Sequence, residues 1–206
     1  MGIVRWGPPE DLLVALRQRL GIDTFVETGT FEGRTAQWAA GVFRNVKTVE
    51  LSERMFASTA LRLSRFDNVE AAQGHSADFL REIVAELERP AIFWLDAHWC
   101  GGGAPTSGAP DSVCPVLAEV AEINRSPLDH VILVDDARYF LEPPEPPYDP
   151  AAWPGIADVL AALHAPGKQR YSVVKDDVIV CVPAVARDVV VQYCRNNPTP
   201  KPTAAR

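Results

Sequence analysis

The chain has 206 residues, of which 47% are hydrophobic, and a formal net charge of −7. This length and composition predict one domain with a sizeable core over residues 1–195, and the acidic balance argues against a nucleic-acid partner. No apolar run reaches membrane-spanning length and the N-terminus lacks the pattern of a signal peptide, so we expect a cytoplasmic protein without membrane contact. The four cysteines show no paired spacing and are expected to stay reduced: Cys100, Cys114, Cys181 and Cys194.

The N-terminal segment predicts an amphipathic helix that ends at Leu20. Pro8 and Pro9, followed by two acidic residues, are typical of a helix start, and Gly21 is typical of a helix end. We expect this helix to cover the sheet ahead of its first strand.

The next segment has the order strand, glycine turn, helix, strand and carboxylate. FVETGTFEG leads into Arg34–Phe43, where apolar residues recur at helical intervals, and VKTVEL follows. Glu27 and Glu50 each end an apolar run and lie 23 residues apart, about the length of one βαβ unit. In such a unit, Gly29 and Gly33 let the backbone approach a ligand, and the second carboxylate takes both hydroxyls of a ribose. A nucleoside cofactor is therefore predicted.

The glycine turn distinguishes between two such cofactors. Dinucleotide-binding folds usually carry GxGxxG and place a pyrophosphate on a helix N-terminus, whereas this chain has ExGxxxG. Glu27 repels a pyrophosphate but suits a cofactor that carries an ammonium and a sulfonium. The alternative is an ordinary α/β turn with a helix-capping glutamate, and the spacing to Glu50 favours the cofactor.

At these residues the chain resembles the class I S-adenosylmethionine-dependent methyltransferases, and the resemblance extends along most of its length. It implies that Glu27 holds the methionine amino end, that Thr28 to Phe31 line its backbone, and that Glu50 takes the ribose. It also implies adenine contacts at His75 and Ser76, although Ser76 could equally be a helix N-cap. The predicted cofactor-binding residues are Glu27, Thr28, Gly29, Thr30, Phe31, Gly33, Glu50, His75, Ser76 and Asp96.

Strands and helices alternate along the chain. Strands are predicted at Thr24–Glu27, Val46–Glu50, Val69–Gln73, Ala91–Asp96 and His130–Val134, and further helices at Glu53–Arg65, Ala77–Glu88, Pro115–Asn124 and Ile156–His164. Such crossovers force parallel pairing with right-handed connections, and YSVVKDDVIVCV predicts a closing hairpin. The predicted fold is therefore α/β and Rossmann-like: a doubly wound, mostly parallel seven-stranded sheet with a C-terminal antiparallel hairpin. Residues 196–206 are expected to be a disordered tail.

Three carboxylates follow the fourth and fifth predicted strands. IFWLDAHWCGGG places Asp96 at one strand end, and VILVDDARYF places Asp135 and Asp136 at the next, where ligands bind in open α/β sheets. Packed closely, these groups repel one another, so without a cation at least one is expected to hold a proton. A hard divalent ion such as Mg²⁺ removes this repulsion. In the alternative interpretation, Asp135 caps a helix and Asp136 is solvated.

Here the resemblance narrows to the metal-dependent O-methyltransferases of the catechol and macrocin types. It implies that Asp96, Asp135 and Asp136 hold Mg²⁺ or Mn²⁺. The catechol-type enzymes have a lysine shortly after the first aspartate, and this chain has none there. His98 lies two residues beyond Asp96 and is predicted as the general base, with a substrate contact or a structural role as alternatives.

The sequence as a whole predicts a metal-assisted O-methyltransferase of a small hydroxylated acceptor, a sugar or a phenol, with Asp96 and His98 as catalytic residues. A glycine-rich loop at 100–115 suits a lid, and His98, Cys100 and Cys114 are an alternative zinc set. A metal-independent methyltransferase, or a cofactor-binding sensor or scaffold without turnover, is also compatible with these residues. So is a homodimer formed through the N-terminal helix or the proline-rich loop.

Overall fold

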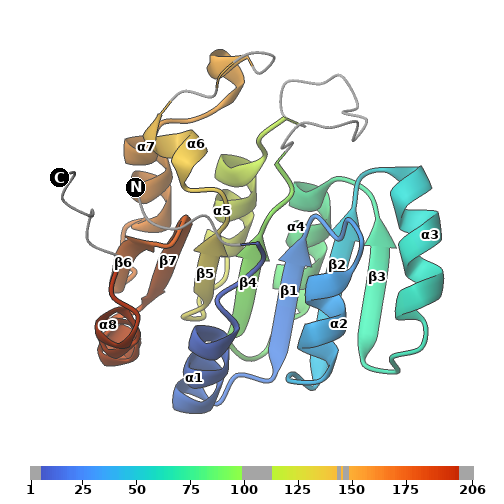
Figure 1. Cartoon of the computed structure of the whole chain (residues 1–206), viewed down its shortest axis with the longest axis horizontal. Coiled ribbons are helices and arrows are strands. Elements are labelled where there is room, and N and C mark those ends of the chain that lie inside the picture. Colours follow the sequence, from blue (N-terminus) through green and yellow to red (C-terminus); the bar gives the residue numbers. More distant parts are fainter. Residues whose placement is uncertain (1–5, 99–112, 143–144, 146–148, 200–206) are drawn as a thin grey trace, which may run out of the picture.

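A computed structural model describes residues 6–98, 113–142, 145 and 149–199 of the chain. Within them lies one seven-stranded sheet in the order β3-β2-β1-β4-β5-β7-β6 (Figure 1). The first five strands pair in parallel, and β7 is antiparallel to β5 and to β6. The predicted fold class is confirmed. The strands are β1 (Thr24–Thr28), β2 (Asn45–Glu50), β3 (Val69–Gln73), β4 (Ala91–Leu95), β5 (Val131–Val134), β6 (Arg170–Lys175) and β7 (Val178–Pro183).

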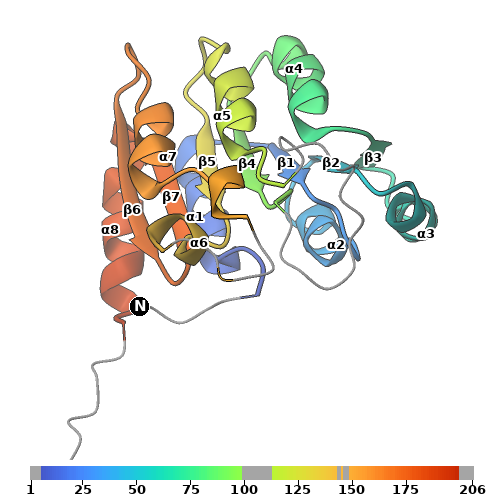
Figure 2. The same cartoon turned by 90° about the horizontal axis from the view of Figure 1, so that it is seen from above.

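Helices cover both faces of the sheet, as Figure 2 shows from above. One face carries α1, α2, α3 and α8, and the other carries α4, α5 and α7. Each described helix is too short or too polar to cross a membrane. The helices are α1 (Glu10–Leu20), α2 (Arg34–Ala40), α3 (Glu53–Leu63), α4 (Ser76–Glu86), α5 (Val116–Asn124), α6 (Arg138–Leu141), α7 (Ile156–Leu163) and α8 (Arg187–Asn196).

Burial of the strands follows their position in the sheet. Every residue of β4, β5 and β7 is buried, because these central strands are covered on both faces. The edge strands β3 and β6 are only partly buried. The fully apolar runs AIFWL and VILV therefore place the carboxyl ends of β4 and β5, and the acidic residues that follow them, at the middle of the sheet.

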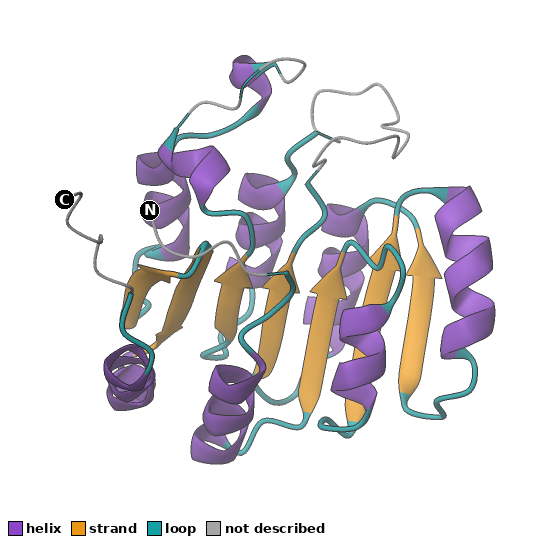
Figure 3. Cartoon of the chain, viewed as in Figure 1, coloured by secondary structure: helices purple, strands orange, loops and turns teal. Residues whose placement is uncertain are grey.

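The described boundaries differ from the predicted ones by at most three residues, β3 has the predicted bounds, and two α-helices were not predicted. One is α8, which follows the hairpin and packs Val190 against α1. The other is the short α6 directly after the aspartate pair. Figure 3 shows both among the alternating helices and strands. Residues 100–112 of the predicted lid and residues 200–206 of the predicted tail lie outside the described residues.

Candidate active site

The turn after β1 brings two strand ends into close contact. Gly29 has a φ of +84°, and a Cβ atom there would lie 2.1 Å from the backbone oxygen of Asp96. The N–H groups of Gly29 and Thr30 both donate to the carbonyl of Val49, at 2.9 and 3.1 Å. Glycine is therefore required at position 29 by the backbone that directly follows β4, in addition to the ligand approach expected from the sequence.

The second predicted glycine has a different neighbour. Gly33 has a φ of +72°, and a Cβ atom there would lie 2.7 Å from Thr59 Cγ2 on α3. The Thr59 hydroxyl donates to the Phe31 carbonyl at 2.7 Å, which fastens the turn to that helix. Gly33 therefore allows α3 to pack against the turn, while the Phe31 ring is exposed.

Glu50 ends β2 and is fixed by the backbone on both of its oxygens. Phe31 N–H donates to Oε2 at 2.8 Å, and Ser52 N–H donates to Oε1 at 2.9 Å. A carboxylate has about four acceptor positions, so each oxygen can accept one further hydrogen bond. The Glu50 carboxylate is thus held in one orientation and can still receive two hydroxyl groups.

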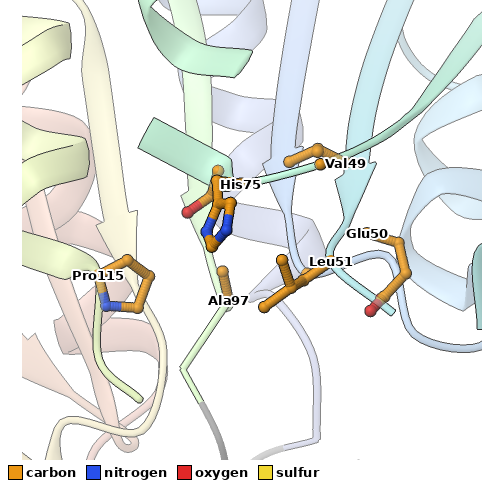
Figure 4. Close-up of a pocket in the computed structure, with 9 residues that line it drawn as sticks. Val49, Glu50, Leu51, His75, Ala97 and Pro115 are labelled. Carbon is orange, nitrogen blue, oxygen red and sulfur yellow. The ribbon is translucent and has the colours of Figure 1, made fainter. Parts of the chain in front are cut away.

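A hollow of about 360 Å³, including its open mouth, lies beside Glu50 at the carboxyl ends of β1, β2, β3 and β4. In Figure 4, Pro115 and Glu50 lie on opposite sides of the hollow, with His75, Ala97 and Leu51 between them. Four of the predicted cofactor-binding residues line this hollow, and five of its lining residues were not predicted. The predicted ones are Gly29, Glu50, His75 and Ser76, and the others are Val49, Leu51, Gly74, Ala97 and Pro115.

Glu27 does not line this hollow; it is buried on β1, opposite Thr48 of β2. The Thr48 hydroxyl donates to Glu27 Oε2 at 2.7 Å and shares a 2.6 Å contact with the Thr30 hydroxyl. Burial raises the pKa of Glu27 to about 8, although the hydrogen bonds from Thr48 and Thr35 lower it. Its predicted contact with a methionine amino group stays a prediction, as do the predicted roles of Thr28, Thr30 and Phe31.

The raised pKa of Glu27 predicts a pH dependence of stability. Between the ordinary value of 4.5 and about 8, the folded protein holds a proton at Glu27 that the unfolded chain has released. The free energy of unfolding should therefore fall as pH rises through this window, by up to about 1.4 kcal/mol per pH unit. We expect Glu27→Gln to remove this share of the slope in urea unfolding between pH 5 and 8.

The control for this measurement is Glu53→Gln, which changes an exposed glutamate at the start of α3 and should keep the wild-type slope. Asp96 and Asp135 also have raised pKa values and are present in all three proteins, so the difference between slopes is the informative quantity. An unchanged slope in Glu27→Gln would contradict the assignment.

Acidic side chains gather where β4 and β5 end. Burial, followed by the charges of Asp135 and Asp136, raises the pKa of Asp96 well above its usual range. Burial and the charge of Asp136 raise the pKa of Asp135 to about 7. The repulsion expected from the sequence is therefore present, and it is the situation that a bound cation relieves.

Asp136 is held from two sides. His98 Nε2 lies 2.8 Å from Asp136 Oδ2, and Arg138 Nη1 donates to Asp136 Oδ1 at 2.5 Å. Burial opposes ionisation of Asp136, but the contacts with His98 and Arg138 outweigh it and lower the pKa of Asp136. Asp136 has a φ of +54°, an uncommon conformation that this loop must stabilise.

The β6–β7 turn supplies that support. Ala137 N–H donates to the carbonyl of Asp177 at 2.7 Å, and Arg138 N–H donates to Asp177 Oδ1 at 2.8 Å. The Arg138 side chain also forms an ion pair with the Asp177 carboxylate. The closing hairpin therefore fixes the loop that carries Asp136. The sequence predicted Asp177 only as part of a turn, because this contact joins residues 39 positions apart.

One group of described residues has the geometry of a metal site: Asp96, His98 and Asp136. One ligand atom from each lies within 4.8 Å of the other two. His98 stands here in place of Asp135, whose Oδ1 accepts the Asp136 N–H at 2.8 Å. The all-carboxylate set stays a prediction. Cys100, a member of the alternative zinc set, lies outside the described residues.

Aromatic rings surround His98. Its ring centroid lies 5.4 Å from that of Trp153 and 6.2 Å from that of Phe140, both with edge-to-face geometry. Tyr139 lies against Trp153 at 5.1 Å, and the Arg138 guanidinium lies over the Tyr139 ring at 4.4 Å. The imidazole is therefore confined between an acidic group and an apolar wall.

A further buried carboxyl was missed. Glu119 on α5 is 1% exposed, and its Oε1 has no hydrogen-bond partner among the described residues. Burial raises the pKa of Glu119, while the side chains of Thr28 and of Ser76, which lines the hollow, lower it. The signal was a single glutamate on the apolar side of VLAEVAEIN, which the 3.6-residue period places facing the sheet.

Comparisons with known proteins bear on the fold. Neither a protein-family model nor a curated protein sequence matches the chain. Among solved structures, it is similar to the O-methyltransferase TomG from Streptomyces achromogenes, involved in tomaymycin synthesis and solved with SAM. The TM-score is 0.58 at 19% identity, over 87% of this chain and 82% of that one.

The O-methyltransferase from Bacillus cereus, solved with SAH, gives a TM-score of 0.59 at 20% identity, over 87% of this chain and 82% of that one. Likeness at this level of identity establishes the architecture and leaves the acceptor open. The strand order, the antiparallel β7 and these structures together show that the chain has the class I S-adenosylmethionine-dependent methyltransferase fold.

Proposed function

We propose that the chain is an S-adenosylmethionine-dependent methyltransferase that methylates a hydroxyl of a small molecule, a sugar or a phenol, with the help of a divalent cation. One observation carries this proposal. Ala97 lines the hollow, and its two chain neighbours, Asp96 and His98, belong to the acidic group at the ends of β4 and β5. A methyl donor in the hollow would therefore lie beside groups suited to activate a hydroxyl.

The residues around the hollow fit a nucleoside. Glu50 offers two oriented oxygens for the ribose hydroxyls. Leu51, Ala97 and Pro115 offer apolar contact to a base, and Ser76 begins α4, whose N-terminal N–H groups can donate to polar ligand atoms. These contacts do not require Glu27 to reach the ligand.

The acidic group fits a cation. Asp96 and Asp136 would hold the cation. Without it, these two carboxylates and that of Asp135 repel one another when they are ionised, and this repulsion favours cation binding. A divalent cation supplies the Lewis acidity that makes an acceptor hydroxyl easier to deprotonate. The chain's own part is to orient the acceptor oxygen toward the methyl donor, and Arg138 keeps the Asp136 carboxylate in place for this.

The surroundings favour a small acceptor. Tyr139 is partly exposed and continues the aromatic wall formed by Phe140 and Trp153, against which a sugar or phenol ring packs well. The net charge of −7 disfavours a nucleic-acid acceptor, because phosphate contacts need clustered Lys and Arg.

The proposal is tested by following S-adenosylhomocysteine release from S-adenosylmethionine with a panel of catechols and hydroxylated sugars, in the presence of Mn²⁺ or Mg²⁺. We expect release with at least one acceptor class, and a rate lowered by roughly 10²-fold or more in Asp96→Asn. Glu53→Gln is the control and should retain activity. Tight S-adenosylhomocysteine binding without turnover of either class would contradict the enzyme proposal and support a sensor or scaffold.

A further inference from the structure

The group at the ends of β4 and β5 contains the His98 imidazole, whereas the predicted Mg²⁺ site consists only of the carboxylates of Asp96, Asp135 and Asp136. We propose that His98 binds the cation directly, together with Asp96 and Asp136, and that the site therefore prefers Mn²⁺ or a similar transition ion to Mg²⁺. This deepens the metal assistance in the proposed function, but it rests on the geometry of these three side chains.

The distances support coordination by all three groups. His98 Nε2 lies 2.8 Å from Asp136 Oδ2 and 3.9 Å from Asp96 Oδ1. With metal–ligand bonds of about 2.1 Å, two ligand atoms on one ion lie at most about 4.2 Å apart. The largest separation in the group is within 4.8 Å, so small side-chain movements bring the three atoms onto one ion.

The group is also oriented in advance. Arg138 donates a hydrogen bond to Asp136 Oδ1, and Asp136 Oδ2 therefore lies on the side of His98. Asp177 fixes Arg138 in turn, through its backbone and its side chain. The rings of Trp153 and Phe140 confine the His98 imidazole, and the His98 side chain is 2% exposed. Contacts of this kind, made to the ligands and not to the ion, set the orientation of metal ligands and raise affinity.

The Asp135 carboxylate is not oriented toward this three-residue group. Its Oδ1 accepts the N–H of the next residue, Asp136, and it is not a member of the three-residue group. An Asp135→Asn substitution keeps an oxygen for that hydrogen bond. Substitutions of Asp135 and Asp136 are therefore a matched pair. The proposed ligand set loses a ligand only when Asp136 is changed, whereas the all-carboxylate set loses one in either case.

The ligand chemistry gives the ion preference. Mg²⁺ favours oxygen ligands and retains water, whereas imidazole suits transition ions, above all Fe²⁺, Ni²⁺ and Zn²⁺. Mn²⁺ binds most weakly of the first-row series, but it accepts a nitrogen ligand more readily than Mg²⁺ does. Two carboxylates and one imidazole therefore favour a transition ion. A nitrogen whose lone pair is given to the ion cannot accept a proton, so this proposal and the predicted role of His98 as general base exclude each other.

The test uses the chelator-treated protein and Mn²⁺ or Mg²⁺ alone, so no acceptor is needed. Calorimetry should show Mn²⁺ binding at least about tenfold more tightly than Mg²⁺. Pulsed electron paramagnetic resonance of bound Mn²⁺ should show coupling to a directly bonded ¹⁴N. We expect His98→Ala to abolish this coupling and to weaken Mn²⁺ binding by about 10- to 100-fold or more.

Asp136→Asn should weaken Mn²⁺ binding similarly, while Asp135→Asn should stay within about threefold of wild type. Thermal melting and S-adenosylhomocysteine binding of each variant show whether it is folded, and they report on the cofactor site separately from the metal. Absence of ¹⁴N coupling, an equal or stronger preference for Mg²⁺, a large loss in Asp135→Asn, or no metal binding would each overturn the proposal. Mn²⁺ binding with ¹⁴N coupling but no S-adenosylhomocysteine binding would uphold it while contradicting the proposed function.

Discussion

Gly29→Ala should destabilise the fold by about 2–5 kcal/mol. The new Cβ atom would lie 2.1 Å from the backbone oxygen of Asp96, which cannot rotate away as a side chain can. Overpacking of this kind costs about 1–3 kcal/mol or more, and the left-handed backbone adds about 1–2 kcal/mol. For a chain of this size the melting temperature should fall by roughly 10 °C.

Gly167→Ala is the matched control for this effect. Gly167 has the same φ of +84°, but no described atom outside its own chain neighbours lies within 4 Å of a Cβ placed there. Gly167→Ala should therefore lower the free energy of unfolding only by the cost of the left-handed backbone, about 1–2 kcal/mol. Urea unfolding of both variants therefore isolates the contact between β1 and β4. Equal losses would show that the strand ends do not approach as described.

Glu50→Ala should weaken S-adenosylhomocysteine binding by about 1–3 kcal/mol, or roughly 5- to 150-fold, because hydrogen bonds from the ribose to a charged acceptor are lost. The substitution also releases the N–H groups of Phe31 and Ser52, which now donate to Glu50. Glu50→Gln keeps one oxygen for these groups and removes the charge, so its loss should be intermediate.

Glu53→Gln, three residues further along, should bind the ligand as wild type does. If Glu50→Ala binds S-adenosylhomocysteine with unchanged affinity in calorimetry, Glu50 only stabilises the turn and does not bind the ligand. Urea unfolding of the same variant distinguishes ligand binding from a structural role, since loss of a purely structural contact would lower stability without lowering affinity.

Much of the architecture follows from local sequence patterns. The runs at β4 and β5 are wholly apolar, as strands covered on both faces must be, and the helical periods between them force parallel crossovers. The helix α8 was missed because its VVV run has high β-propensity, and only packing of Val190 against α1 decides in favour of a helix.

The candidate site was predictable where it depends on strand ends and not where it depends on side-chain direction. Strand order alone places Glu50, Asp96 and Asp136 at one edge of the sheet. It does not show that Asp135 turns to the backbone of its own loop, or that Asp177 reaches Arg138 from a distant hairpin. Such contacts arise only when the tertiary fold brings these segments together.

The hollow beside Glu50 is expected to bind the nucleoside of S-adenosylmethionine, and the proposed function depends on this binding. The direct measurement is a calorimetric titration of the purified wild-type protein with S-adenosylhomocysteine and, separately, with NAD. We expect one S-adenosylhomocysteine per chain to bind, and no binding of NAD, because the turn lacks the GxGxxG pattern and carries acidic groups unsuited to a pyrophosphate. Binding of NAD with equal affinity, or no binding of S-adenosylhomocysteine, would contradict this assignment of the hollow.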